Sequence, residues 1–133
     1  MLSRESLEQV DRNKCILVVD GQRENRLRLG NKLKNLGFPV QLFASDGAEA
    51  LQMYQAFHKD ISVVIIDHRL PHMDGEKLFW NIKQFDPKAS IIFCSIDLEW
   101  EVIDPMLGSG LKALLVKPFE EEKLASALVA AFN

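Results

Sequence analysis

Four residues with reactive side chains stand where short apolar runs of the chain end: Asp20, Asp67, Ser95 and Lys117. If these runs are parallel strands, their carboxyl ends lie along one edge of a sheet, so the four side chains converge there. A carboxylate can attack phosphorus, a lysine offsets the charge of neighbouring carboxylates, and a hydroxyl can donate a hydrogen bond to a phosphoryl oxygen. The pattern predicts a phosphoacceptor site centred on Asp67.

The apolar runs alternate with segments of helical periodicity. The runs are mostly continuous rather than alternating in polarity, which is typical of strands buried on both faces. They cover residues 15–19, 40–43, 61–66, 91–94 and 113–116. Leucines and aromatic residues at i, i+3 or i+4 spacing fill the intervals, and right-handed crossovers between parallel strands then give a doubly wound α/β sheet.

The fourth predicted helix, residues 99–109, has Pro105 near its middle. Proline removes one backbone donor and clashes with the preceding turn of a helix. We therefore expect a kinked or shortened helix there.

Length and composition limit the class of protein. With 133 residues and 47% hydrophobic content, the chain is sized for one domain, which we place at residues 14–133 after a polar arm at 1–13 that is either frayed or a short helical leader. The net charge is -3 and no Lys/Arg block occurs, which argues against direct contact with nucleic acid or a membrane surface. No apolar run approaches the roughly 20 residues of a membrane span, and the N-terminus lacks a signal-peptide core, so we expect a cytoplasmic protein.

Several of these segments together resemble the receiver domain of bacterial two-component response regulators, chemotaxis regulators among them. The matching segments are ILVVD (16–20), ASDGAEAL (44–51), Asp67 with LPHMDG (70–75), Ser95, and KPF (117–119). They occur in the expected order and intervals, and the match runs from about residue 14 to residue 132. The resemblance implies a flavodoxin-like (βα)5 fold with a five-stranded parallel sheet in the order 2-1-3-4-5.

The resemblance also implies roles for individual residues. Asp67 would accept a phosphoryl group from a histidine kinase or phosphotransfer protein, with Ser95 and Lys117 binding the phosphoryl oxygens. Mg²⁺ would be held by Asp20, Asp67 and the backbone carbonyl of Arg69. Lys117-Pro118 would be a cis peptide, as in the family.

The metal site departs from the family pattern. Receiver domains normally carry a second acidic residue after the first strand, and Gly21 stands there instead. Loss of one carboxylate ligand should weaken Mg²⁺ binding by roughly 10- to 100-fold. Two compensations are open: Gln22 or Glu24 supplies a ligand, or the guanidinium of Arg69 folds over the acidic pocket and partly replaces the metal.

The predicted switch and output face departs as well. Ile96 follows Ser95 where the family favours Ala or Gly, and it could obstruct the phosphoryl donor or the hydrolytic water. Leu114 replaces the aromatic residue that follows the switch hydroxyl in the family. Together with Pro105, these residues call the usual output surface into question.

The sequence therefore indicates a signalling receiver rather than an enzyme, acting on an unknown downstream protein, with homodimer formation left open. The first alternative is a phosphorylation-independent pseudo-receiver that serves as a protein interaction module, which Gly21, Ile96 and Leu114 favour. The second is a small α/β hydrolase or phosphatase that uses Asp67 as a covalent nucleophile. Against it, Arg69 occupies the position two residues on, where a second catalytic acid would stand, and no Gly-rich phosphate loop follows a strand.

Overall fold

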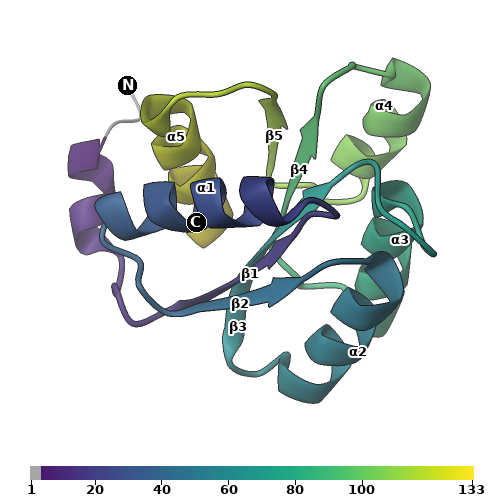
Figure 1. Ribbon diagram of the computed structural model, residues 1–133, viewed down its shortest axis with the longest axis horizontal. Helices are drawn as coiled ribbons and strands as arrows, with labels where there is room; N and C mark the ends of the chain where they lie inside the picture. Colours follow the sequence, from purple (N-terminus) through teal and green to yellow (C-terminus); the bar gives the residue numbers. More distant parts are fainter. Residues whose placement is uncertain (1–3) are drawn as a thin grey trace.

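A computed structural model describes residues 4–133, with side chains from Leu7 onward. It contains one parallel five-stranded sheet in the order β2-β1-β3-β4-β5, with the helices on both faces (Figure 1). The predicted flavodoxin-like (βα)5 fold and its strand order are confirmed. The elements in chain order are η1 (Arg4–Gln9), β1 (Cys15–Val19), α1 (Arg23–Asn35), β2 (Gln41–Ala44), α2 (Gly47–Phe57), β3 (Ile61–Asp67), α3 (Gly75–Phe85), β4 (Ile91–Ser95), α4 (Trp100–Gly108), β5 (Ala113–Val116) and α5 (Glu121–Phe132).

Alternate residues of each central strand belong to two separate cores. In β1, Ile16 and Val18 pack with the apolar residues of α1 and α5, whereas Leu17 and Val19 pack with those of α2, α3 and α4. The same division holds in β3, since successive side chains of a strand point to opposite faces. Burial on both faces fixes the register of β1 and β3, and with it the position at which each strand ends.

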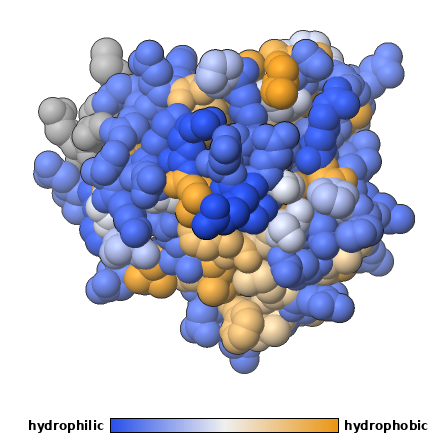
Figure 2. Space-filling view, in the orientation of Figure 1, coloured by the Kyte–Doolittle hydropathy of each residue, from blue (hydrophilic) through white to orange (hydrophobic). Residues whose placement is uncertain are grey.

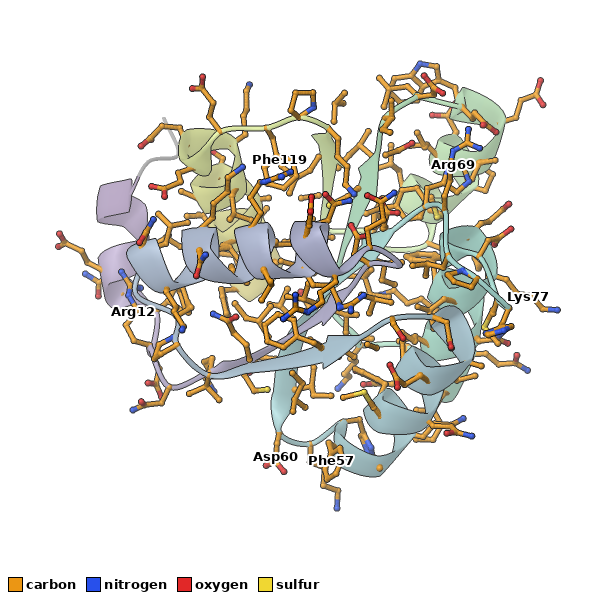
Figure 3. The ribbon with its side chains drawn as sticks, in the orientation of Figure 1. Arg12, Phe57, Asp60, Arg69, Lys77 and Phe119 are labelled. Atoms are coloured by element: carbon orange, nitrogen blue, oxygen red, sulfur yellow. The ribbon has the colours of Figure 1, made fainter. Side chains whose placement is uncertain are left out.

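The segment before β1 packs against the domain. Of the two expectations for this arm, the short helical leader is the one that forms: η1 is a 3-10 helix, and Leu7 is fully buried in the core under α1 and α5. The guanidinium of Arg12 donates to the carbonyls of Leu7 and Val10 and lies 4.7 Å from the ring centroid of Phe38 (labelled Arg12 in Figure 3). Residues 1–3 of the predicted arm lie outside the described residues.

The fourth helix accommodates its proline. α4 runs from Trp100 to Gly108, within the predicted interval, and Pro105 is exposed inside it, where its ring does not enter the core. Within residues 4–133, no helix is both long and apolar enough to cross a bilayer.

Candidate functional site

The side chains of Asp20, Asp67 and Lys117 meet at the carboxyl edge of the sheet. Asp20 follows β1, Asp67 is the last residue of β3, and Lys117 follows β5. The Lys117 Nζ lies 2.7 Å from Asp20 Oδ2 and 2.7 Å from Asp67 Oδ1. One ammonium therefore bridges two carboxylates that are 97 and 50 residues away in sequence, as the predicted convergence requires. We call these three residues the acidic triad.

Burial and mutual contacts shift the pKa values of Asp67 and Lys117 in the acidic triad. The side chains of Asp20, Asp67 and Lys117 are 6%, 15% and 20% exposed. Burial raises the pKa of Asp67, and the neighbouring Asp20 raises it further, against the opposing effect of Lys117. Burial by itself would lower the pKa of Lys117, but its hydrogen bonds to both carboxylates outweigh that effect and raise it. The lysine is thus held as a fixed cation beside a partly desolvated carboxylate.

The first turn of α1 holds Asp20 in place. The backbone N–H of Gln22 donates to Asp20 Oδ1 at 2.9 Å, and Asn25 Nδ2 lies 3.4 Å from the same oxygen. Arg26 Nη1 donates to the backbone carbonyl of Asp20 at 2.8 Å. Sequence reasoning missed Asn25 and Arg26; their only signal was their position in the first helical turn after a strand-ending aspartate.

A close approach of backbone segments positions Asp67. A Cβ atom at Gly75 would lie 2.2 Å from the backbone carbonyl oxygen of Asp67, so no larger residue fits there without moving the loop. The N–H of Gly75 donates to the carbonyl of His68 at 2.8 Å, and Asp74 caps α3 by accepting from the N–H of Lys77. Asp74 therefore serves as the N-cap of α3, and Gly75 is the first residue of that helix.

Ser95 lies at the same edge but makes a local contact. It ends β4, its side chain is buried, and its hydroxyl donates to the backbone carbonyl of Asp97. The structure brings Ser95 into the same cavity as the acidic triad. Its hydroxyl, however, is engaged by the β4–α4 loop rather than by Lys117 or Asp67.

The guanidinium of Arg69 does not fold over the acidic triad. It pairs with the carboxylate of Asp97 at 3.7 Å, and the Arg69 side chain is 72% exposed (labelled in Figure 3). The hypothesis that Arg69 replaces the metal charge is therefore wrong for this conformation. An exposed guanidinium keeps its hydration and its partner Asp97, whereas insertion at the triad would cost desolvation where Lys117 already offsets part of the negative charge.

The oxygen atoms around the acidic triad are of the type that coordinates Mg²⁺, but they are few. Two carboxylates are present, and Lys117, Gln22 and Asn25 already donate to the oxygens of Asp20. Within residues 4–133, no three His, Cys, Asp or Glu side chains are grouped as metal ligands. Gly21 contributes no side chain, and a Cβ atom there would lie 3.1 Å from Pro71 Cδ. The residues fit a metal site that depends on two carboxylates, backbone carbonyls and water.

A cavity of about 480 Å³ opens beside the acidic triad and continues along α1. Its walls come from the ends of β1, β3, β4 and β5 and from one face of α1. The lining residues are Asp20, Gln22, Asn25, Arg28, Leu29, Lys32, Asp67, His68, Arg69, Ser95, Ile96, Lys117, Pro118 and Phe119. The Lys117-Pro118 peptide in this wall is cis, as the resemblance implied.

Comparison with known proteins agrees with this geometry. Residues 16–129 match the family model of the response regulator receiver domain. The chain is 32% identical over 118 residues to the chemotaxis protein CheY of Bacillus subtilis, a match that covers 89% of this chain and 97% of that protein. It is 35% identical over 103 residues to the sensor histidine kinase RcsC of Escherichia coli, covering 77% of this chain and 10% of the kinase.

The solved structures give the same result. The CheX-CheY-BeF3-Mg+2 complex from Borrelia burgdorferi contains a chain with a TM-score of 0.84 and 28% identity, covering 90% of this chain and 89% of that chain. This chain belongs to the response regulator receiver domain family. Domains of that family receive signals in two-component phosphorelays, interact with histidine kinases or phosphotransfer proteins, generally bind Mg²⁺ at the phosphorylation site, and are generally not enzymes.

Proposed function

We propose that this domain accepts a phosphoryl group on Asp67 from the phosphohistidine of a histidine kinase or phosphotransfer protein. The observation that carries the proposal is the bridge from Lys117 Nζ to both carboxylates at 2.7 Å. Two buried carboxylates would otherwise repel each other and an incoming phosphoryl group. The lysine offsets that charge while leaving Asp67 at the wall of an open cavity.

In the proposed step, a carboxylate oxygen of Asp67 forms a bond to phosphorus as the bond between phosphorus and the donor histidine nitrogen breaks. The electron pair of that bond returns to the imidazole, and the product is an aspartyl phosphate. Lys117 then remains next to the new negative charge. Ser95 can exchange its acceptor, the carbonyl of Asp97, for a phosphoryl oxygen by rotation of its hydroxyl.

We further propose that Mg²⁺ is bound weakly, by Asp20, Asp67 and the backbone carbonyl of Arg69. When bound, the ion would stabilise negative charge on the transferring phosphoryl group. Gly21 removes one charged ligand, and Lys117 competes for the two carboxylates that remain. We therefore expect this domain to need more Mg²⁺ than receivers with a complete acidic pair.

The output is proposed to be a protein contact of α4 and β5. Large apolar side chains are exposed on these elements, at Trp100, Leu107 and Val116, and in the loop before α4, at Ile96 and Leu98. Exposed apolar surface is typical of interaction sites when its members adjoin one another. Its partner is a downstream protein or a second copy of this chain.

A second candidate is a phosphorylation-independent interaction module. It is supported by the contact between the Ser95 hydroxyl and the Asp97 carbonyl, together with Gly21 and with Leu114 in place of an aromatic residue. In such a module the β4–α4 loop would hold one conformation whatever the state of Asp67.

Intact mass measurement separates the two candidates. The protein is incubated with acetyl phosphate, with and without Mg²⁺, beside the Asp67→Asn variant and an Asp97→Asn control that changes an exposed carboxylate outside the triad. Mg²⁺-dependent gain of one phosphate in the wild type and in Asp97→Asn, but not in Asp67→Asn, is the expected result. No gain at high Mg²⁺ with both acetyl phosphate and a kinase partner would favour the interaction module. Turnover of a generic phosphoester would instead revive the phosphatase alternative.

A further inference from the structure

The cavity beside the acidic triad extends well beyond the residues that the proposed phosphoryl transfer uses. Its far end is built from α1 and the β5–α5 loop, with Arg28, Leu29 and Lys32 on one wall and Pro118 and Phe119 on the other. Figure 3 shows Phe119 above α1, whereas Arg69 lies near α4. The whole cavity, including the end at the acidic triad, has a volume of about 480 Å³, which is within the range of sites that bind small organic molecules.

The far end carries positive charge that the acidic triad does not neutralise. Arg28 and Lys32 are four residues apart on α1, so they lie on one face of the helix. Their donors contact neutral oxygens: Arg28 Nη1 lies 3.5 Å from Asn25 Oδ1, and Lys32 Nζ donates to the carbonyl of Phe119 at 2.7 Å. Neither side chain forms an ion pair with a carboxylate among the side chains described, those of residues 7–133. An anion would therefore meet two cations that have no carboxylate partner among the described side chains.

The same end offers an apolar surface beside these cations. Leu29 is half-buried between Arg28 and Lys32, and the Phe119 ring faces the Lys32 ammonium, with Nζ 4.9 Å from the ring centroid. Pro118 extends this wall toward the acidic triad. A ligand with both a negative head and a flat or apolar body matches this combination better than a bare ion does.

We propose that this α1–α5 end of the cavity is a binding site for small organic phosphates with an apolar or aromatic body. The phosphate lies at Arg28 and Lys32, away from the repulsion of Asp20 and Asp67, and the body lies against Leu29 and Phe119. Binding is reversible and does not require phosphoryl transfer to Asp67, so the inference goes beyond the proposed function.

The proposal is tested by titrating the wild-type protein with phenyl phosphate. Binding is measured from the shifts of the backbone amide NMR signals. Inorganic phosphate and phenol are titrated separately to represent the head and the body alone. We expect saturable shifts at Arg28, Lys32 and Phe119, with phenyl phosphate binding about tenfold or more tightly than either fragment. Asp67→Asn should bind phenyl phosphate at least as tightly as the wild type does, because one repelling carboxylate is removed, and this separates failure of this inference from failure of the proposed phosphoryl acceptance.

Charge variants on α1 provide the matched comparison. Arg28→Gln, at an exposed position, should weaken binding by about threefold or more, and Leu29→Ala should weaken phenyl phosphate without changing inorganic phosphate. Lys34→Gln, on the same helix but outside the cavity, should have no effect. Equal affinity for phenyl phosphate and inorganic phosphate, shifts confined to other surfaces, or the same loss in Lys34→Gln as in Arg28→Gln would each overturn the proposal.

Discussion

The acidic triad and the β4–α4 loop lie at the same edge of the sheet but are held in different ways. In the triad, largely buried side chains from three strand ends form ion pairs with one another, although they are far apart in sequence. In the loop, Ser95 bonds to a carbonyl two residues away, and Ile96 is 64% exposed. Movement of a triad residue would expose a buried charge, whereas the loop can rearrange at little cost. The proposed acceptance of a phosphoryl group and the proposed response to it are therefore assigned to separate parts of the structure.

The largest expected effect comes from removing the cation of the triad. Lys117→Met should lower the free energy of unfolding by about 3 kcal/mol, because two buried carboxylates are left without their counter-charge. It should also abolish phosphoryl uptake from acetyl phosphate. Urea unfolding and intact mass measure the two effects, with Lys112→Met as a control at an exposed lysine. An unchanged unfolding midpoint would show that the triad is no more constrained than the loop.

The second prediction restores the missing acidic residue. Gly21→Asp should strengthen Mg²⁺ binding by roughly 10- to 100-fold, since a third carboxylate joins the two present. The new Cβ atom lies 3.1 Å from Pro71 Cδ, so a shift of a few tenths of an ångström at the loop is required. Calorimetric titration measures the affinity, and Gly21→Asn separates the charge from the added volume. Equal gains in both variants would contradict the role of the charge.

The third prediction concerns the raised pKa of Asp67. Because its pKa is higher in the folded state than in the unfolded chain, the ionised carboxylate disfavours folding, fully so above the folded pKa. Asp67→Asn leaves Lys117 paired with Asp20 and should stabilise the fold by about 1 kcal/mol at neutral pH. The difference should shrink as the pH falls through the folded pKa toward the usual aspartate value. Urea midpoints of both proteins across this pH range provide the measurement. A stability difference that grows as the pH falls would show that the pKa of Asp67 is not raised by folding.

The smallest expected effect on stability is at the loop. Ile96→Ala should change the free energy of unfolding by less than about 0.5 kcal/mol, because the side chain is largely in solvent. It should nevertheless speed both gain and loss of the phosphate on Asp67, since a branched side chain no longer lines that part of the cavity. Time courses of intact mass test this, with Leu98→Ala as a control in the same loop. Identical rates in Ile96→Ala and wild type would show that the loop does not limit access.

Exposed apolar side chains also occur away from the triad and the loop, on another face of the molecule. Figure 2 shows apolar side chains over β2 and α2 on the face turned to the viewer, and Phe57 at the end of α2 is half exposed. The output surface proposed at α4 and β5 is a different group of residues.

Much of this architecture could be predicted from the chain because burial imposes a local pattern. Continuous apolar runs such as 15–19 and 61–66 are readable as strands buried on both faces, and both strands lie within a residue of the predicted bounds. The positions of Asp20, Asp67 and Lys117 at one edge then follow from parallel topology alone. Leu7 was missed because it and Val10 are too few apolar residues, in a polar segment, to establish a periodicity.

The sequence by itself determined which elements form, which residues end the strands, and that a glycine, Gly21, follows Asp20. Only the tertiary structure decided which partner each side chain takes. Arg69 turns to Asp97, Ser95 bonds its own loop, and Lys117 bridges two carboxylates. Such choices depend on burial and on distances of a few ångströms between residues far apart in the chain, and those quantities exist only after the strands have packed.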